Sequence, residues 1–488
     1  MVKLKVKFLN LSAGRPVAIL NKRFAEKVSI HVDERISISH SGEKIIAVVD
    51  IAEDLLREDE IALSTEIISA MKLKERDIVS IDLAEKPESL GFIYKKLNGE
   101  KLNGKELSAI IGDIVKNNLT ESEIAYFVSA VYKCGMTFEE TLNLIKALLE
   151  TGKELGLKGE VADKHGTGGI PGRTTPIIVS ICAAAGLLMP KTSSRAITTP
   201  AGTADALETV CKVDFSVESI RKILKKTNAC MVWGGSLNLA PADDKIIQVE
   251  RLLNLDPEPQ LLASIIAKKL AVNAKYVLID IPYGKYAKFN KKEAFELAKK
   301  FRKIGKYFKI KLECDLKEVN EPLGNGIGPV LEIKDVIKVL RRQSSCHKLE
   351  QRSLELAGRL LEISGKAGKR EGKKLAKKIL DSGLAYKKFL QIVKAQKGSI
   401  DGIGEADYKQ DIISEKSGRI EEINIKEINN LARIAGCPLD KYAGVYLYKH
   451  LSDKVSKGEK ILTIYAESET ELEEAVKYYR KTKPIVIN

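Results

Sequence analysis

The segment from Asp163 to Gly169, which reads DKHGTGG, has the strongest chemical character in the sequence. It follows Val161 and precedes an apolar, helix-like run over 174–188. Glycines let a backbone approach an anion closely, and free N–H groups at a helix start bind phosphate. The pattern differs from the Walker A and G-x-G-x-x-G motifs. A plain structural turn would also use these glycines, but the neighbouring Lys164 and His165 favour an anion site.

A second segment concentrates hydroxyl groups around one arginine. Residues 193–205 read SSRAITTPAGTAD, which gathers five hydroxyl side chains close to Arg195. Hydroxyls and a guanidinium are good donors to phosphate and ribose oxygens. The same residues would also form a turn in which Thr203 caps a helix over 204–210. The two interpretations are compatible, so the segment predicts a substrate loop that runs directly into a helix.

An acidic residue flanked by prolines lies ahead of a predicted helix. Asp256 is followed by Pro257 and Pro259, and Ser264 and Lys268 recur behind it at helical spacing. Two prolines restrict the backbone, so the loop can present Asp256 to a ligand in one conformation. Asp256 is equally suited to cap the helix, with Pro257 at its first position. The residues alone leave both roles open.

The fourth candidate segment ends in a lysine. Lys288 closes the sequence PYGKYAK, which follows the apolar stretch 277–281. That stretch predicts a buried strand, and loops after parallel strands are where α/β sheets bind ligands. Lys288 could contact an anion there, although most lysines simply lie on the surface.

The elements that must position these segments predict a multidomain α/β protein. The predicted parts are an N-terminal β-rich domain (1–84), a linker (84–91), a helical domain joined by later helices (92–158), a central α/β domain with a mixed sheet (159–345) and a C-terminal α+β region (346–488).

Local signals place several elements within these domains. Apolar residues over 107–114 recur at i, i+3, i+4 and i+7, which predicts a buried helix face. Thr120 to Glu123 and Thr137 to Glu140 are capping boxes for two more helices. The first of these should end near Gly135. The basic stretch 372–396 is predicted as helical.

The composition is that of a globular protein from a reducing compartment. Of the 488 residues, 44% are hydrophobic and 30% charged, with no run of eighteen uncharged apolar residues. Seven scattered cysteines without C-x-x-C pairs fit reduced thiols, so we expect a cytoplasmic protein with no membrane partner. The net charge of +15 is spread over lysines interleaved with glutamates, so a solvated surface is favoured over nucleic-acid binding.

Together these residues resemble the thymidine/pyrimidine-nucleoside phosphorylase family, and most closely its archaeal AMP phosphorylase branch. DKHGTGG is similar to the family's DKHSTGG element, and SSRAITTPAGTADALE is similar to its SGRxxxxTGGTxDKLE element. NLAPAD (238–243), ASIIAKK (263–269) and EPLG (321–324) also resemble family elements. The matches keep their order from about residue 92 to the C-terminus.

The departures from the family pattern favour the nucleotide branch. Gly166 stands where nucleoside phosphorylases carry serine, Pro200-Ala201 replaces Thr-Gly, and Ala206 replaces lysine. The loop 254–259 differs from the segment that carries a base-contacting arginine in thymidine phosphorylase. The N-terminal 84 residues have no counterpart in the bacterial enzymes.

The resemblance implies a site, an assembly and a reaction. Asp256 would be the proton donor. The AMP contacts would be Gly168, Ser194, Arg195, Ala196, Ile197, Thr198, Thr199, Thr203, Ser264 and Lys288. The family places its active site in the cleft between the helical and α/β domains, forms homodimers or higher homo-oligomers, and needs no metal or organic cofactor. The substrates would be AMP and inorganic phosphate, with adenine and ribose 1,5-bisphosphate as products in nucleotide degradation or salvage. CMP and UMP are further candidate substrates.

This chemistry suits the residues. Phosphorolysis at C1′ builds positive charge on the ribose and negative charge on the leaving base. Placing phosphate against C1′ is mainly a matter of orientation. The base leaves more easily if a ring nitrogen is protonated, which a carboxylic acid such as Asp256 can do. The 5′-phosphate needs its own donors, for which Arg195, Thr198, Thr199 and Lys288 are candidates.

Other functions remain open at this point. A nucleoside phosphorylase acting on thymidine or uridine would use the same fold without 5′-phosphate recognition. A phosphoribosyltransferase would need Mg²⁺, and the sequence shows no acidic cluster that argues for it. An RNA-binding protein without catalysis would fit the positive charge, but aromatic residues for base stacking make up only 6% of the chain.

Overall fold

The computed structural model describes residues 2–237, 239–343 and 346–488. The chain divides into two compact units, each made of two stretches: Met1–Gly152 with Ala240–Ala267, and Lys153–Leu239 with Lys268–Asn488. Asn238 of the NLAPAD segment and the predicted domain boundary at residue 345 lie outside the described residues. Within the described ranges, no helix is both long and apolar enough to cross a membrane.

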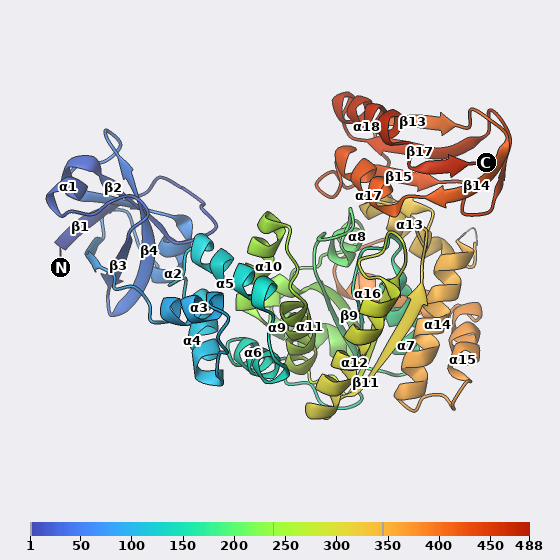
Figure 1. Ribbon diagram of the computed structural model, residues 1–488, viewed down its shortest axis with the longest axis horizontal. Helices are drawn as coiled ribbons and strands as arrows, with labels where there is room; N and C mark the ends of the chain where they lie inside the picture. Colours follow the sequence, from blue (N-terminus) through green and yellow to red (C-terminus); the bar gives the residue numbers. More distant parts are fainter. Residues whose placement is uncertain (1, 238, 344–345) are drawn as a thin grey trace. The chain divides into compact units, whose positions relative to one another are not determined.

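The N-terminal strands close into a six-stranded barrel, drawn in blue in Figure 1. Its elements are β1 (Val2–Lys7), β2 (Val17–Asn21), α1 (Lys22–Lys27), β3 (Arg35–His40), β4 (Glu43–Ala52), β5 (Glu60–Leu63), α2 (Thr65–Met71) and β6 (Ile78–Leu83). The order is β1-β5-β2-β4-β3-β6, and β6 pairs back onto β1. Alternate residues such as Leu4, Val6, Ile36 and Ile38 fill the interior.

Six helices make up the rest of the first unit: α3 (Ser89–Leu97), α4 (Gly104–Val115), α5 (Glu121–Cys134), α6 (Phe138–Glu150), α10 (Pro241–Leu253) and most of α11 (Glu258–Ala271). Both predicted capping boxes are present, Gly135 caps α5, and the apolar face over 107–114 is buried. The predicted linker is too long, because α3 already begins at Ser89, whose side chain is buried. The Pro87 carbonyl accepts a hydrogen bond from Leu90 at the start of this helix.

A half-buried lysine ties α10 to α4 inside the first unit. Lys245 Nζ donates to the carbonyl oxygens of Ile114 and Val115 at 2.8 and 3.0 Å. These carbonyls end α4, where the helix dipole favours a cation. Burial lowers the pKa of Lys245 to about 8. The later helix α10 therefore packs with the earlier helices inside the first unit.

The second unit begins with an α/β domain. Its elements are β7 (Ala162–Gly166), α7 (Thr174–Ala184), β8 (Met189–Ser193), α8 (Thr203–Glu208), α9 (Val217–Thr227), β9 (Ala229–Trp233), a 3₁₀ turn (Gly234–Leu237), β10 (Tyr276–Tyr283), α12 (Lys291–Tyr307), β11 (Lys311–Glu318), β12 (Gly326–Ile327), α13 (Pro329–Leu340), α14 (His347–Ile363), α15 (Gly372–Asp381) and α16 (Leu384–Ala395).

Parallel strands set the position of the substrate loops. The ladders run β11-β10-β7 and β8-β9, and a parallel bridge between Val161 and Leu188 joins the two. The ends of β7 and β10 therefore lie at the same edge, where the segments after Gly166 and Tyr283 begin. Behind this edge α7 is buried along almost its whole length and contacts α13, α14, α15 and α16 (Figure 1).

The stretch 372–396 is helical, as predicted, and it forms two helices. Gly383 separates α15 from α16 with a φ of +76°, in the left-handed region that glycine adopts most easily. The break turns the apolar residues of both helices onto the same core.

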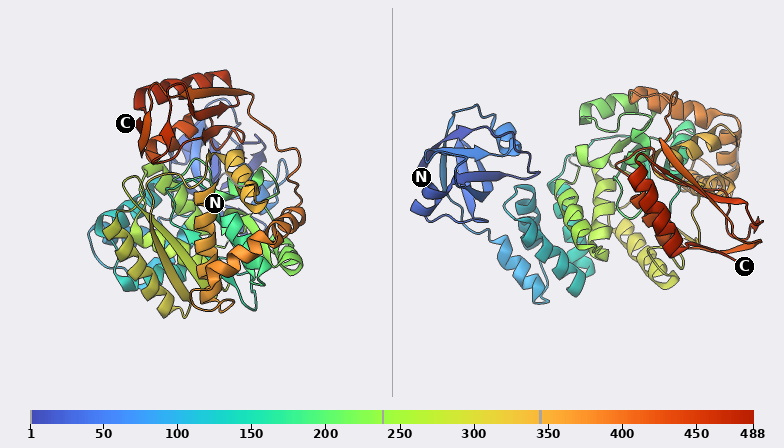
Figure 2. Two further views of the ribbon diagram at one scale, coloured as in Figure 1. Left: turned by 90° about the vertical axis from the view of Figure 1, so that its right-hand side faces the viewer. Right: turned by 90° about the horizontal axis from the view of Figure 1, so that it is seen from above.

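The C-terminal domain is built from two small sheets and two helices, visible again in the two turned views of Figure 2. Its elements are β13 (Tyr408–Ile413), β14 (Gly418–Ile423), α17 (Ile425–Ile434), β15 (Gly444–Leu447), β16 (Lys454–Val455), β17 (Lys460–Ala466), α18 (Glu469–Thr482) and β18 (Ile485–Ile487). The sheet orders are β12-β15-β17-β13 and β16-β14-β18. The predicted multidomain α/β organisation is confirmed.

Candidate active site

The glycine segment forms the connection from β7 to α7. Gly168 and Gly169 both have φ near +90°, in the left-handed region that disfavours other residues. A Cβ on Gly168 would lie only 2.6 Å from Thr198 Oγ1, so a side chain has no room there. The loop ends at the N-terminus of α7, where free N–H groups and the helix dipole favour an anion.

The hydroxyl loop is fastened directly to this glycine loop. Thr198 Oγ1 accepts a hydrogen bond from the Gly169 N–H at 3.0 Å. Arg173 Nη2 donates to Thr199 Oγ1 at 3.2 Å and to the Ala201 carbonyl at 2.7 Å. The two segments, separate in the sequence, therefore form one structure.

Arg173 owes its orientation to a buried carboxylate that the sequence reasoning missed. Its Nε pairs with Glu332 of α13, which lies 159 residues further along the chain. Burial raises the pKa of Glu332, and the nearby Arg173 guanidinium opposes that rise. An arginine just ahead of the predicted helix was the one local signal that could have drawn attention to this position.

Carboxylates organise the start of the hydroxyl loop. Asp205 Oδ2 accepts from the N–H groups of Ala196 and Gly202, both at 2.7 Å. Gly202 is therefore the residue that caps α8, and the prediction of Thr203 as the cap is off by one position. Thr203 instead opens the helix, because the carboxylate at its third position satisfies the cap N–H.

Arg195 is held by two carboxylates. Its guanidinium donates to Glu208 at 2.9 and 3.0 Å and to Asp205 at 3.1 Å, and it lies 5.0 Å above the Trp233 ring. The Glu208 hydrogen bond raises the pKa of Arg195. In this conformation the guanidinium fixes the loop, and its predicted contact with AMP stays a prediction.

Buried charges lie beside the glycine loop. Lys269 Nζ is 2.6 Å from Asp163 Oδ2, and Lys191 Nζ is 3.7 Å from the other oxygen of Asp163. Lys164 Nζ is 3.2 Å from Asp280 and also donates to Thr174 Oγ1 at 3.2 Å. Arg352 completes the cluster by pairing with Asp280 and Asp315. Arg352 also lies 3.7 Å from Glu355. The four cations of the cluster, Lys164, Lys191, Lys269 and Arg352, are all buried, whereas only two of its carboxylates, Asp163 and Asp280, are.

The charge surplus shifts the titration of its members. Burial lowers the pKa of Lys191 to about 7, against the opposing pull of Asp163. Burial also lowers the pKa of His165 far below its usual range, and the positive charges of Lys269 and Lys191 lower it further. His165 is therefore neutral near pH 7. A bound anion would compensate the surplus of positive charge around these groups.

Three buried polar atoms around the loops have no hydrogen-bond partner within the described part of the chain: His165 Nδ1, Thr167 Oγ1 and Ser193 Oγ. Buried polar groups are normally satisfied, so orphaned atoms in one place indicate room for a ligand's oxygens or hydroxyls. Gly166 ends β7 at the start of the glycine loop. A Cβ there would lie 3.2 Å from Lys164 Nζ.

Lys288 lies against the glycine loop through its backbone. Its N atom would be 3.3 Å from a Cβ placed on Gly169. Lys288 Nζ lies 5.4 Å from the centre of the Phe289 ring. The second unit thus brings together Gly168, the loop Ser194 to Thr199, Thr203 and Lys288, and their contacts with AMP stay a prediction.

Asp256 and Ser264 belong to the first unit. Asp256 is exposed in the loop between α10 and α11, just after Asn254, whose φ of +53° ends α10. The Pro257 carbonyl accepts the first backbone bond of α11, from Leu261 at 3.0 Å. Ser264 Oγ donates to Asp243 Oδ2 at 2.9 Å, which joins α11 to the LAPAD segment of α10.

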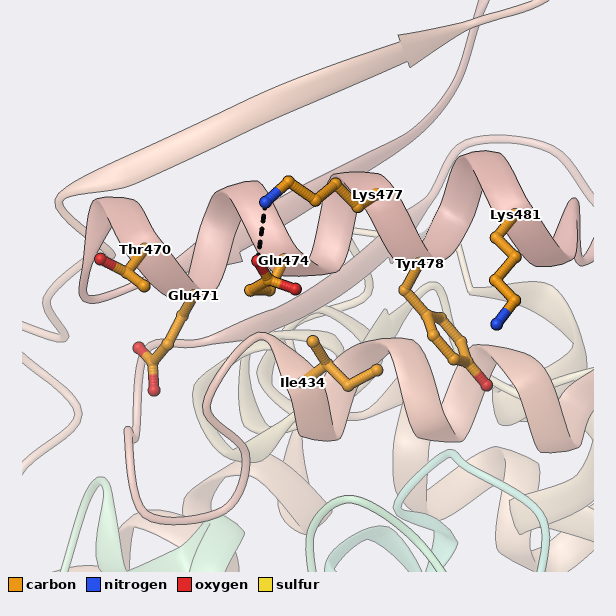
Figure 3. Close-up of a pocket in the computed structure, with 7 residues that line it drawn as sticks. All are labelled: Ile434, Thr470, Glu471, Glu474, Lys477, Tyr478 and Lys481. Atoms are coloured by element: carbon orange, nitrogen blue, oxygen red, sulfur yellow. Dashed lines mark hydrogen bonds and ion pairs between the residues drawn. The ribbon is translucent and has the colours of Figure 1, made fainter.

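A separate groove of about 550 Å³ lies between α17 and α18. Figure 3 shows its lining, which consists of Ile434, Thr470, Glu471, Glu474, Lys477, Tyr478 and Lys481. It contains both acidic and basic side chains and none of the predicted site residues.

Comparison with known proteins agrees with this arrangement. Three family models match in succession: the helical bundle domain of a glycosyl transferase family over 91–152, the a/b domain of that family over 158–386, and the pyrimidine nucleoside phosphorylase C-terminal domain over 419–486. A crystal structure of anthranilate phosphoribosyltransferase from Thermus thermophilus matches with a TM-score of 0.51 and 17% identity, covering 63% of this chain and 99% of that one. The fold and site are those of a glycosyl transferase that carries this C-terminal domain.

Proteins that match this chain over its full length define its family more closely. The AMP phosphorylases of Methanococcus vannielii and Methanocaldococcus jannaschii are each 41% identical over 493 residues, covering 99% and 100% of this chain and 97% and 98% of the relatives. That of Pyrococcus furiosus is 40% identical over 492 residues, covering 99% of this chain and 97% of its own. The chain belongs to the AMP phosphorylase family.

Proposed function

We propose that this protein catalyses the phosphorolysis of AMP by inorganic phosphate, releasing adenine and ribose 1,5-bisphosphate. The observation that carries the proposal is the union of the glycine and hydroxyl loops beside a surplus of buried positive charge. Both substrates are anions, so such a place suits them. Membership of the AMP phosphorylase family supports the choice of AMP. CMP and UMP are secondary candidates, since the donors described would serve the phosphates and ribose of any nucleotide.

The proposed roles follow from the chemistry of each group. The glycine loop and the N-terminus of α7 hold phosphate, and the loop Ser194 to Thr199 with Thr203 and Lys288 holds the nucleotide. Asp256 protonates the leaving base, and Ser264 contacts the substrate from α11. Asp256 is exposed, so it is accessible to a substrate. Excluding water from such a site favours phosphate over water as the nucleophile.

We also infer that the protein works in the cytoplasm as a homodimer or larger homo-oligomer. All seven cysteines are unpaired thiols, as expected for a reducing compartment. The oligomeric state rests on the family resemblance and is tested by measuring the mass of the protein in solution.

The deciding experiment is incubation with phosphate and, in turn, AMP, adenosine, CMP, UMP or thymidine, following free base and sugar phosphate. Release of adenine and ribose 1,5-bisphosphate from AMP, with little release from adenosine, supports the proposal. Release of thymine or uracil with AMP inert would move the protein to nucleoside phosphorolysis and remove the proposed role of Lys288.

A further inference from the structure

Helix α17 of the C-terminal domain reaches both loops of the candidate site. Asn429 Nδ2 donates to the carbonyl oxygen of Gly169 at 3.3 Å. One turn later, Arg433 Nη2 donates to the carbonyl oxygen of Ile197 at 3.2 Å. Residues four apart lie on the same helix face. One face of α17 therefore holds the glycine loop and the hydroxyl loop together.

The strand ahead of α17 holds the third loop. Glu422 of β14 accepts from Lys285 Nζ at 2.8 Å and from the Tyr286 hydroxyl. These two residues lie in the loop that leads to Lys288. The segment 422–433 thus contacts all three loops that the proposed function assigns to substrate.

Asn429 differs from the other two contacts in its burial. It is only 5% exposed, whereas Arg433 is exposed and Glu422 half-buried. Its Nδ2 donates to the Gly169 carbonyl oxygen, but its Oδ1 is buried and has no partner among the described residues. Leaving a buried acceptor unsatisfied is costly, so such an atom commonly serves a ligand. Gly169 is itself flanked by Gly168 and by the Lys288 backbone.

The neighbouring face of α17 anchors the helix within its own domain. The Tyr478 hydroxyl of α18 donates to Glu427, and Asn430 Nδ2 donates to that hydroxyl at 3.3 Å. Figure 3 shows Ile434 of α17 and Tyr478 of α18 facing each other across the groove. Asn430 Oδ1 also accepts from Arg433 Nη1 at 3.4 Å. Asn430 therefore offers a comparison of the same residue type on the same turn, which contacts α18 directly and the hydroxyl loop only through Arg433.

We propose that Asn429 is a positioning residue for the reaction. Its amide group holds the glycine loop through the Gly169 carbonyl, and its Oδ1 accepts a hydrogen bond from a ribose hydroxyl of the bound nucleotide. Hydroxyls are the donors that the ribose phosphate part of AMP retains at neutral pH. The assignment rests on the proposed function, because it takes the three loops as substrate loops.

The first experiment compares Asn429→Ala with Asn430→Ala in steady-state kinetics with phosphate and AMP. Removing one loop-holding hydrogen bond should raise the KM for phosphate about five- to tenfold in Asn429→Ala. Asn430→Ala should stay within about twofold of the wild type in KM and kcat. Asn429→Asp keeps the side-chain size but places a carboxylate by the Gly169 carbonyl, so its KM for phosphate should exceed that of Asn429→Ala and fall at lower pH.

A second measurement tests Oδ1 with 2′-deoxy-AMP and 3′-deoxy-AMP. At least one analogue should lose about tenfold in kcat/KM with the wild type. In Asn429→Ala that loss should shrink to within about twofold, because the partner of the missing hydroxyl is already absent.

The outcomes separate the inference from the proposed function. If the wild type releases no adenine from AMP, the proposed function fails. If the wild type is active while Asn429→Ala matches Asn430→Ala in both kinetic constants, the positioning role is overturned. Equal discrimination against the deoxy analogues in the wild type and Asn429→Ala would overturn the ribose contact. Thermal unfolding of both variants shows whether either has lost its fold.

Discussion

The loops of the second unit and the Asp256 loop of the first unit are built differently. Two hydrogen bonds join the glycine and hydroxyl loops: Gly169 donates to Thr198, and Arg173 donates to Thr199. Both loops lie beside buried charges. Asp256 instead lies exposed in a short loop between two helices. The first region holds several hydrogen-bonding groups in fixed positions, whereas the second presents one exposed carboxylate.

On the proposed roles, proton transfer belongs to the first unit and most substrate contacts belong to the second, with Ser264 as the exception. An anion site needs several donors in fixed positions, so its residues depend on one another. A proton donor needs access to the leaving group and suffers little from mobility before substrate binds. Changes in the second unit should therefore act on affinity, and changes at Asp256 on turnover.

The largest expected effect is that of Asp256→Asn. Loss of a general acid should lower kcat about 10²- to 10³-fold. Phosphate affinity, measured by calorimetry, should stay within about twofold. Glu258→Gln, two residues away, is the control and should keep near wild-type turnover. If Asp256→Asn keeps the wild-type kcat, Asp256 is not the proton donor. The proposed division of binding and proton transfer between the two regions would then fail as well.

Gly168→Ala tests whether the glycine loop must hold its conformation for an anion to bind. The new Cβ would meet Thr198 Oγ1 at 2.6 Å, on a backbone with a φ of +91°. Strain of this kind should weaken phosphate and AMP binding about 10- to 100-fold.

The matched control for this variant is Gly166→Ala, whose φ is not positive. Its Cβ would meet the flexible end of Lys164 at 3.2 Å and, in ordinary contact, Asp280 Oδ2 at 3.9 Å. It should change binding less than about fivefold. Equal effects of the two substitutions would show that the loop is not preformed at Gly168.

Lys288→Ala tests whether the two substrates use different donors within the second unit. We expect the KM for AMP to rise about tenfold, since a charge-assisted contact to the 5′-phosphate is lost. The KM for phosphate should change less than about twofold. Lys292→Ala, at the exposed start of α12, serves as the control. An unchanged KM for AMP would remove Lys288 from the site.

The smallest effect concerns Lys191, whose pKa is lowered to about 7 by burial. Below pH 7 Lys191 is charged and attracts an anion. Above pH 7 Lys191 loses that proton, so its attraction for an anion weakens and affinity falls. Sulfate, which stays a dianion over this range, should therefore bind about threefold more weakly at pH 8.5 than at pH 6.5.

Lys191→Met should bind sulfate with little dependence on pH. The same lysine makes stability rise between pH 7 and its ordinary pKa of 10.5, because only the unfolded chain holds the proton there. In thermal unfolding, Lys191→Met should be more stable than the wild type at pH 7. This difference in stability should be smaller at pH 9. If the difference in stability is the same at both pH values, Lys191 does not titrate near pH 7.

Features that depend on neighbouring residues were predictable from the sequence. The capping boxes at Thr120 and Thr137 and the strand over 277–281 follow from side chains a few positions apart. The glycine and hydroxyl segments were recognisable because their composition is unusual within a short stretch. Pattern alone could not show the break at Gly383, since glycine also occurs within helices.

Features that depend on distant residues were not predictable. The Arg173–Glu332 pair and the contact from Asn429 to Gly169 span 159 and 260 residues. Nothing local distinguishes buried Lys191 from the many surface lysines. The catalytic role of Asp256 remains a prediction, because it concerns a substrate as well as the chain.

The burial of α7 also sets an order for the synthesis of the protein. The barrel finds all its strand partners within the first 83 residues, so it can fold while the rest is still being translated. The glycine loop ends at α7, whose packing partners α13 to α16 come from residues 329–395. The anion site therefore cannot mature on the ribosome until more than two hundred further residues have emerged, and until then α7 is an apolar segment exposed to chaperones.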